Sequence, residues 1–233
     1  MFYFDPLYLL FSLPAILLVL FAQWKVKSAY AKYTKIANEH GMTGVQAAKR
    51  LLMLNGLNGI SIEGTPGDLT DHYDPRTKTL RLSVGVANTP SVASLGIVAH
   101  EIGHAMQDAT GYLPLKARSA IVPAVQIGST LGPILVIVGL LINFTGLAWV
   151  GVGVFSLALI FAVITLPVEI DASRRALAML NANGLVSRFE ADGVKAILTA
   201  AALTYIAAAA QALSQILYYV FILMGSGNRR RSD

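Results

Sequence analysis

Cysteine is absent from this chain of 233 residues. Its absence excludes disulfide bonds, thiolate metal ligands and a cysteine nucleophile, so any metal site must use histidine, aspartate or glutamate. Histidine is itself scarce, and the four in the sequence are His40, His72, His100 and His104. A histidine-based site therefore has few positions to draw on.

Charged side chains are also few. They make up 13% of the residues, against 55% hydrophobic residues, whereas soluble domains carry about 25% charged residues. Three long stretches, 6–24, 119–168 and 196–228, have no charge. Because about 20 apolar residues span a bilayer, the first and last stretches each suit one crossing, and the middle stretch suits two with a break near Asn143–Gly146. The sequence predicts an α-helical membrane protein with about four transmembrane helices.

The formal net charge is +5, and the basic residues lie mostly beside the apolar stretches. The chain has no basic stripe interleaved with aromatic residues, so this charge indicates membrane topology and no nucleic-acid partner. Lys25, Lys27, Lys32 and Lys35 follow the first stretch, which favours an uncleaved anchor whose N-terminus is outside. A cleaved signal peptide is disfavoured, because the residues before the first apolar stretch include Asp5 and no lysine or arginine.

The polar block at 25–118 is predicted to form a small α+β cytoplasmic domain. Helical patterns cover 25–40 and 43–55, the second with Thr43 as its N-cap, and alternation predicts strands at 59–63 and 77–83. Thr89 and Pro90 then suit the cap and first turn of a helix that runs to about Asp108. The predicted organisation is an anchor at 1–24, the cytoplasmic domain at 25–118, two membrane helices at 119–168, a polar cytoplasmic return at 169–195, a fourth membrane helix at 196–228 and a basic tail at 229–233.

The last predicted helix of that domain contains the motif HExxH, as His100-Glu101-Ile102-Gly103-His104. Residues four apart lie on one face of a helix, so both imidazoles can reach one metal ion. Glu101 projects beside them and can take a proton from metal-bound water. The flanking run Val92–Ala99 is apolar, which indicates a buried helix whose ionisable groups need partners. The motif predicts a zinc site with Glu101 as the catalytic base.

A catalytic zinc needs a third protein ligand and an open position. Glu169 ends the third apolar span, where an acidic group needs a reason to lie at the membrane edge. Spacing alone does not select it, because a solvated helix end paired with Arg174 and Arg175 has the same pattern. His40 and His72 are alternatives, as is the acidic pair Glu190 and Asp192 in the same polar return.

Four segments together resemble the YugP-type family of bacterial membrane zinc metallopeptidases. They are Asp71–Ser83, Ala99–Gln107, Gly111–Ser119 and Leu166–Ala176. The likeness runs through nearly the whole chain and is more specific than HExxH alone. The family is similar in plan to the HtpX and CAAX prenyl protease metallopeptidases, in which two histidines and a downstream glutamate bind zinc near the cytoplasmic membrane face. The resemblance implies a gluzincin-like site with Glu169 as the third ligand.

The resemblance bears less directly on the neighbouring residues. In the HtpX-like pattern an aspartate follows the glutamate by four residues, whereas Asp171 follows Glu169 by two. Asp171, Arg174 and His72 are candidates for orienting the site, with His72 also suiting a plain surface position. The strand residues Thr79, Leu80, Arg81 and Leu82 are expected either to bind substrate as a sheet edge or to form an ordinary core strand.

The predicted function is hydrolysis of peptide bonds by a zinc metalloendopeptidase with one Zn²⁺ per chain. The expected substrate is a membrane or membrane-proximal polypeptide, and an adaptor or an oligomer is compatible with the sequence. One alternative is a non-catalytic membrane scaffold or adaptor with a structural zinc site, which usually has four protein ligands. Another is a metal transporter, which needs charged residues within its spans and is disfavoured by the uncharged stretch 119–168.

The predicted location is the cell membrane, with several crossings and the catalytic domain facing the cytoplasm. Four crossings from an outside N-terminus return the C-terminus to the outside. Arg229, Arg230 and Arg231 then conflict with the positive-inside tendency. A last stretch that does not fully cross is the alternative, so the side of the C-terminus stays open.

Overall fold

The computed structural model describes residues 6–229, with side chains for 6–225. Residues 1–5 of the predicted anchor, and 230–233 of the predicted basic tail, lie outside that range. The chain divides into two compact units. The helical unit comprises 1–22, 117–166 and 204–233, and the mixed unit comprises 23–116 and 167–203.

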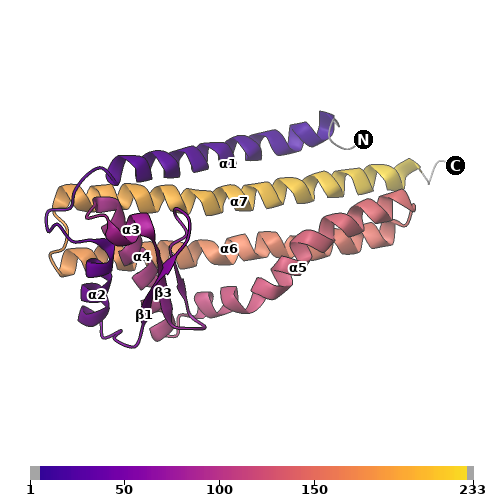
Figure 1. The fold of residues 1–233 in the computed structure, drawn as a ribbon. Helices are drawn as coiled ribbons and strands as arrows, with labels where there is room; N and C mark the ends of the chain where they lie inside the picture. Colours follow the sequence, from indigo (N-terminus) through magenta and orange to yellow (C-terminus); the bar gives the residue numbers. More distant parts are fainter. Residues whose placement is uncertain (1–5, 230–233) are drawn as a thin grey trace. The chain divides into compact units, whose positions relative to one another are not determined.

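Within residues 6–229, four helices are long and apolar enough to cross a membrane, as predicted. They are α1 (Pro6–Tyr33), α5 (Leu113–Leu141), α6 (Thr145–Ala182) and α7 (Arg188–Arg229) (Figure 1). The break between α5 and α6 lies where it was expected, with Asn143 in the left-handed conformation at φ 57°.

Glycine allows α5 and α6 to approach closely in the helical unit. A Cβ atom at Gly132 would lie 2.7 Å from the Cβ of Phe155, and one at Gly151 would lie 2.7 Å from the Gly132 carbonyl oxygen. Real Cβ atoms do not come so near other atoms, so larger residues at either position would push the helices apart. Small residues at helix contacts are typical of membrane proteins, where close backbone packing drives association.

One predicted helix has different bounds in the structure. The helix expected at 25–40 is continuous with the anchor and ends at Tyr33, because no breaker separates the segments. The residues beyond it form turns around a single bridge between Ala37 and Ser91, and Val92 donates its backbone N–H to the Ile36 carbonyl. Within the polar segment 169–195, α6 runs on to Ala182 and α7 begins at Arg188.

The mixed unit contains a three-stranded sheet of order β1-β3-β2 within the described residues. Its strands are β1 (Ser61–Thr65), β2 (His72–Asp74) and β3 (Thr79–Ser83). β1 runs parallel to β3 and β2 runs antiparallel to it. The helix α2 (Gly44–Leu54) precedes the sheet and is capped as predicted by Thr43, which exchanges hydrogen bonds with Gln46.

The prediction that Thr79, Leu80, Arg81 and Leu82 form a substrate-binding edge was wrong. These residues belong to β3, which has a partner strand on both sides, and all of them except the half-buried Arg81 are buried. Their alternating pattern predicts a strand but cannot say which strands flank it. The three-residue strand β2 was missed because it is too short to produce a pattern.

The motif helix α4 spans Val92–Ala109 and begins two residues later than predicted. Its cap is Ser91, whose hydroxyl accepts a hydrogen bond from the Ser94 N–H at 3.1 Å. Thr89 instead ends a short helix, α3 (Val84–Asn88), which was not predicted. Pro90 lies in the extended link between the two helices, where its carbonyl accepts from the Asn38 N–H.

The helix α4 is the centre of the mixed unit. Fourteen of its 18 residues are buried, and its apolar side chains form one core with residues of α2, β3 and the mixed-unit parts of α6 and α7. In Figure 1 the sheet, α2 and α3 gather around α4. This burial holds the motif in a rigid position, which a metal site requires.

Candidate metal centre

His100 and His104 lie one turn apart on α4, with ring centroids 4.8 Å from each other. Their Nε2 atoms converge on one carboxylate oxygen of Glu169, at 3.2 Å from His100 and 3.6 Å from His104. Glu169 comes from α6, 69 residues beyond His100 in the chain. One ligand atom from each residue lies within 4.8 Å of the others. The three side chains therefore form a compact, largely buried cluster.

Gly103, inside the motif, makes this meeting of α4 and α6 sterically feasible. A Cβ atom there would lie 2.5 Å from the carbonyl oxygen of Ala172. Even alanine would therefore force the two helices apart. Glycine lets the α6 backbone at Ala172 lie directly against α4 within the motif.

The donor set fits a catalytic zinc ion. Two imidazole nitrogens and one carboxylate oxygen are ligands that zinc prefers, and three protein ligands leave one position open. The electrostatics agree. Burial acts to lower the pKa of His104, but hydrogen bonding and charge from Glu169, with the charge of Glu101, outweigh it and raise that pKa. Surroundings that stabilise positive charge on His104 also favour a divalent cation.

Glu101 lies beside the cluster without belonging to it. Its Oε2 atom accepts a hydrogen bond of 3.0 Å from the backbone N–H of Tyr73. Burial raises the pKa of this carboxyl above its ordinary value, although positive charge on His100 and His104 acts in the opposite direction. A carboxyl group with a raised pKa is suited to accept and return a proton near neutral pH.

Tyr73 holds β2 against α4 through two hydrogen bonds, one from its backbone and one from its side chain. The backbone N–H of Tyr73 donates to Glu101, and the Tyr73 hydroxyl donates to Asp108 at 2.8 Å. Asp108 also pairs with Lys78. Beside these residues lies an open pocket of about 250 Å³. Ala105 and Asp108 line this pocket, and Glu101 lies on the same face of α4, one turn before Ala105.

Sequence reasoning missed two polar partners of the histidines. The Nδ1 atom of His100 lies 3.3 Å from the Ser173 hydroxyl, and that of His104 lies 3.0 Å from Oε1 of Gln107. Gln107 follows His104 by three residues, and Ser173 follows Glu169 by four. Helical spacing therefore was the available signal, since residues three or four apart share a face.

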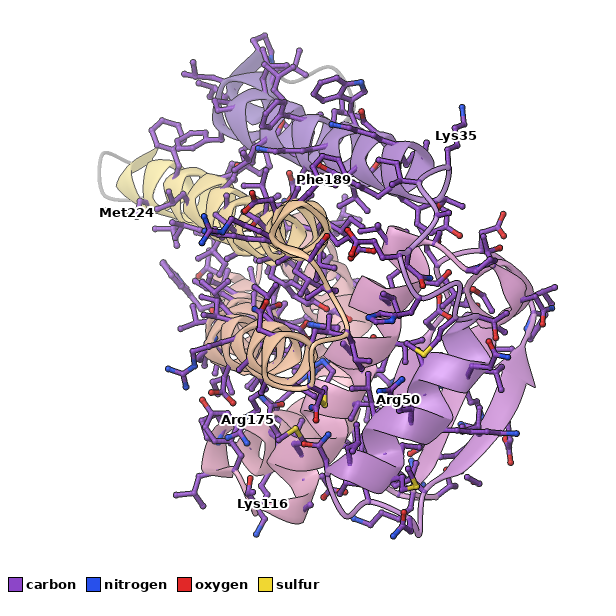
Figure 2. The ribbon with its side chains drawn as sticks, turned by 90° about the vertical axis from the view of Figure 1, so that its left-hand side faces the viewer. Lys35, Arg50, Lys116, Arg175, Phe189 and Met224 are labelled. Atoms are coloured by element: carbon purple, nitrogen blue, oxygen red, sulfur yellow. The ribbon has the colours of Figure 1, made fainter. Side chains whose placement is uncertain are left out.

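Asp171 and Arg174, two of the candidates for orienting the site, lie in a second group. Asp171 accepts hydrogen bonds from Gln107, Arg174 and Arg175. The Arg174 side chain is otherwise 79% exposed. Arg175 lies over the ring of Tyr112, 5.7 Å from its centre, and Figure 2 labels Arg175 on α6 and Lys116 on α5. Asp171 is therefore linked to His104 through Gln107.

The other residues considered as ligands lie elsewhere. His72 is exposed on β2, and its ring is hydrogen-bonded to the Thr70 carbonyl. His40 is also exposed, and its ring is hydrogen-bonded to the Gly184 carbonyl. Glu190 is buried, but its two oxygens accept from the backbone N–H groups of Glu39 and Ser187. Glu190 thus caps α7 and ties it to the segment after α1. The structure does not bring any of these residues into the cluster.

Comparison with known proteins agrees with this geometry. The model of a family described as "Putative neutral zinc metallopeptidase" matches residues 8–224. The chain is also 39% identical over 218 residues to the "Putative membrane protease YugP" of Bacillus subtilis (strain 168), across 94% of this chain and 97% of that protein. No solved structure matches the chain significantly.

Proposed function

This chain belongs to the zinc metallopeptidase family whose model spans residues 8–224, and on that premise we propose that it is a membrane-embedded zinc endopeptidase. The observation that carries the proposal is the convergence of His100, His104 and Glu169, with Glu101 beside them. We assign the three converging residues as the ligands of one zinc ion and Glu101 as the general base and acid.

In the proposed reaction the metal activates water and the protein moves the proton and orients the groups. A bound zinc ion supplies Lewis acidity, which lowers the pKa of a coordinated water to about 7. Glu101 would hold the proton given up by the attacking water and would pass it to the leaving nitrogen of the peptide. The Tyr73 N–H holds one oxygen of Glu101, so the carboxylate is oriented before substrate arrives. The edge strand β2 is the part of the sheet that lies beside Glu101, and we assign it to the substrate backbone.

A scaffold with a structural zinc site fits the donor set less well. Structural sites usually use four protein ligands, whereas the cluster found among the described residues offers three. Three protein ligands would leave a position for water, which a catalytic site requires. We therefore favour catalysis over a purely structural role.

Metal removal tests the proposed activity without knowledge of the substrate. Membranes that contain the wild-type protein should accumulate new peptide amino termini, which mass spectrometry can count. We expect 1,10-phenanthroline to abolish this accumulation and added zinc to restore it, because the nucleophile depends on the metal. The purified protein should also carry about one zinc per chain. A zinc-loaded protein that generates no termini above an empty-membrane control would contradict the proposal.

We further propose that the active site faces the cytoplasm at the membrane boundary. The support is the cluster Lys25, Lys27, Lys32 and Lys35 just after the first apolar stretch. The substrate is then a membrane or membrane-proximal polypeptide on that side, and an adaptor or a second copy of the chain is compatible with this assignment.

Cysteine labelling tests this orientation, because the native chain has no cysteine to give background. Asp68→Cys lies at an exposed position in the mixed unit, and Phe144→Cys lies in the exposed turn between α5 and α6. In intact cells, a membrane-impermeant thiol reagent should label position 144 and spare position 68 until the cells are opened. Labelling of position 68 in intact cells would place the mixed unit outside.

A further inference from the structure

Gln107 is fully buried, at 0% exposure, and both atoms of its side-chain amide are used. Its Nε2 atom donates to the Val168 carbonyl at 2.8 Å and to an Asp171 carboxylate oxygen at 3.0 Å. Its Oε1 atom lies 3.0 Å from Nδ1 of His104. The amide thus connects a histidine of the candidate metal site to two groups on α6.

These partners leave the amide one orientation. A backbone carbonyl and an ionised carboxylate can only accept hydrogen bonds, so the NH₂ group must face Val168 and Asp171. Arg174 and Arg175 both donate hydrogen bonds to Asp171 and hold its oxygens in place as acceptors. A flipped amide would set its oxygen against two acceptors. The Gln107 oxygen must therefore face His104.

The orientation of Gln107 in turn decides which nitrogen of His104 carries a proton. An amide oxygen accepts and cannot donate, so Nδ1 of His104 must be the protonated nitrogen. The Nε2 atom is then the one with a lone pair for a metal, and it is this atom that points toward Glu169. The hydrogen bond made by one ring nitrogen commonly fixes the metal-binding role of the other.

His100 lacks an equivalent constraint. Its Nδ1 atom faces the Ser173 hydroxyl at 3.3 Å, and a hydroxyl can rotate to donate or to accept. Ser173 therefore accommodates either tautomer of His100. Of the two partners, only Gln107 can select the protonation site of its histidine.

We propose that Gln107 is a positioning residue that locks His104 in the Nδ1–H tautomer, with Nε2 free for the metal. Asp171 and the Val168 carbonyl orient Gln107, so Asp171 acts on the metal site through this amide. The proposal rests on the assignment of His104 as a zinc ligand. It gives a role to the buried Gln107 and to Asp171, which pairs with both Arg174 and Arg175.

Zinc affinity tests the role of Gln107, with Ser173→Ala as the matched comparison. Gln107→Met keeps the length of the side chain but removes the acceptor. We expect it to weaken zinc binding by about 10–100-fold, the usual effect of removing a group that orients a metal ligand. Ser173→Ala should weaken binding less. Competition with a chromogenic chelator gives both values, and thermal unfolding of the zinc-free proteins checks that each variant folds.

Nuclear magnetic resonance of ¹⁵N-histidine gives a second readout, and its deciding measurement is made on the wild-type protein. In wild-type protein loaded with ¹¹³Cd, the metal should couple to Nε2 of His104, and the Nδ1 proton should exchange slowly with water. In Gln107→Met that proton should exchange faster. Coupling through Nδ1 in the wild type would overturn the proposal even if Gln107→Met failed to fold.

Two outcomes separate this proposal from the metal assignment. If wild-type protein binds no zinc, the proposed function fails. If wild-type protein binds zinc but folded Gln107→Met binds it equally well, or Ser173→Ala costs as much affinity, only the role of Gln107 fails.

Discussion

Glu101→Gln is expected to retain zinc and to lose peptide hydrolysis by about 10²–10⁴-fold, the usual contribution of a general acid–base group. Glutamine keeps an oxygen that can accept the hydrogen bond from Tyr73, so the fold and the position of β2 should persist. It cannot take a proton from water. The measurements are zinc content by atomic emission and the rate at which new amino termini form.

Glu63→Gln is the matched control for this substitution. Glu63 lies exposed on β1, at the opposite edge of the sheet, and pairs with Arg81. Its replacement should leave both zinc and hydrolysis unchanged. If Glu101→Gln kept its zinc and hydrolysed peptides at the wild-type rate, the peptidase assignment would be abandoned and the metal site alone retained.

The same inactive variant should act as a substrate trap. A photo-crosslinking residue at His72, which is exposed on β2, should capture polypeptides in the Glu101→Gln background. The same residue at Glu63 should capture few, because β1 is the far edge of the sheet. Equal capture at the two positions would remove β2 from the substrate path.

Loss of the metal ligands is the second change with a large expected effect. The double variant His100→Ala, His104→Ala should be purified with essentially no zinc, because two of three protein ligands are gone. Glu169→Ala should also weaken binding, since the carboxylate would supply the third bond. Metal content per chain, measured after identical purification, is the readout. Stoichiometric zinc in the double variant would contradict the assignment of the site.

Glu190→Ala is the control for Glu169→Ala. Glu190 is a buried acid of the same hairpin, but its oxygens bind backbone N–H groups. Its loss should reduce the free energy of unfolding by about 1–3 kcal/mol and leave zinc content unchanged. The reverse pattern, with zinc lost from Glu190→Ala and kept by Glu169→Ala, would move the ligand to the second acidic pair.

Several features of this protein follow from the sequence alone, because they depend on local geometry or composition. The four long helices follow from uncharged stretches that match the thickness of a bilayer. The nearness of His100 to His104 follows from the pitch of a helix. Thr43 and Gln46 cap α2 through contacts within one turn. Each of these depends on residues close together in the chain, so the pattern of residue types is sufficient.

Only the tertiary structure decides which distant groups meet. Glu169, Glu190 and His72 are all compatible with a metal ligand by residue type, but the packing of α6 on α4 at Gly103 brings Glu169 to the histidines and leaves the others apart. The position of β3 between two strands and the orientation of Gln107 by Val168 and Asp171 arise in the same way. Side-chain periodicity identifies the buried face of an element, but the partner of that face depends on how all the elements pack together.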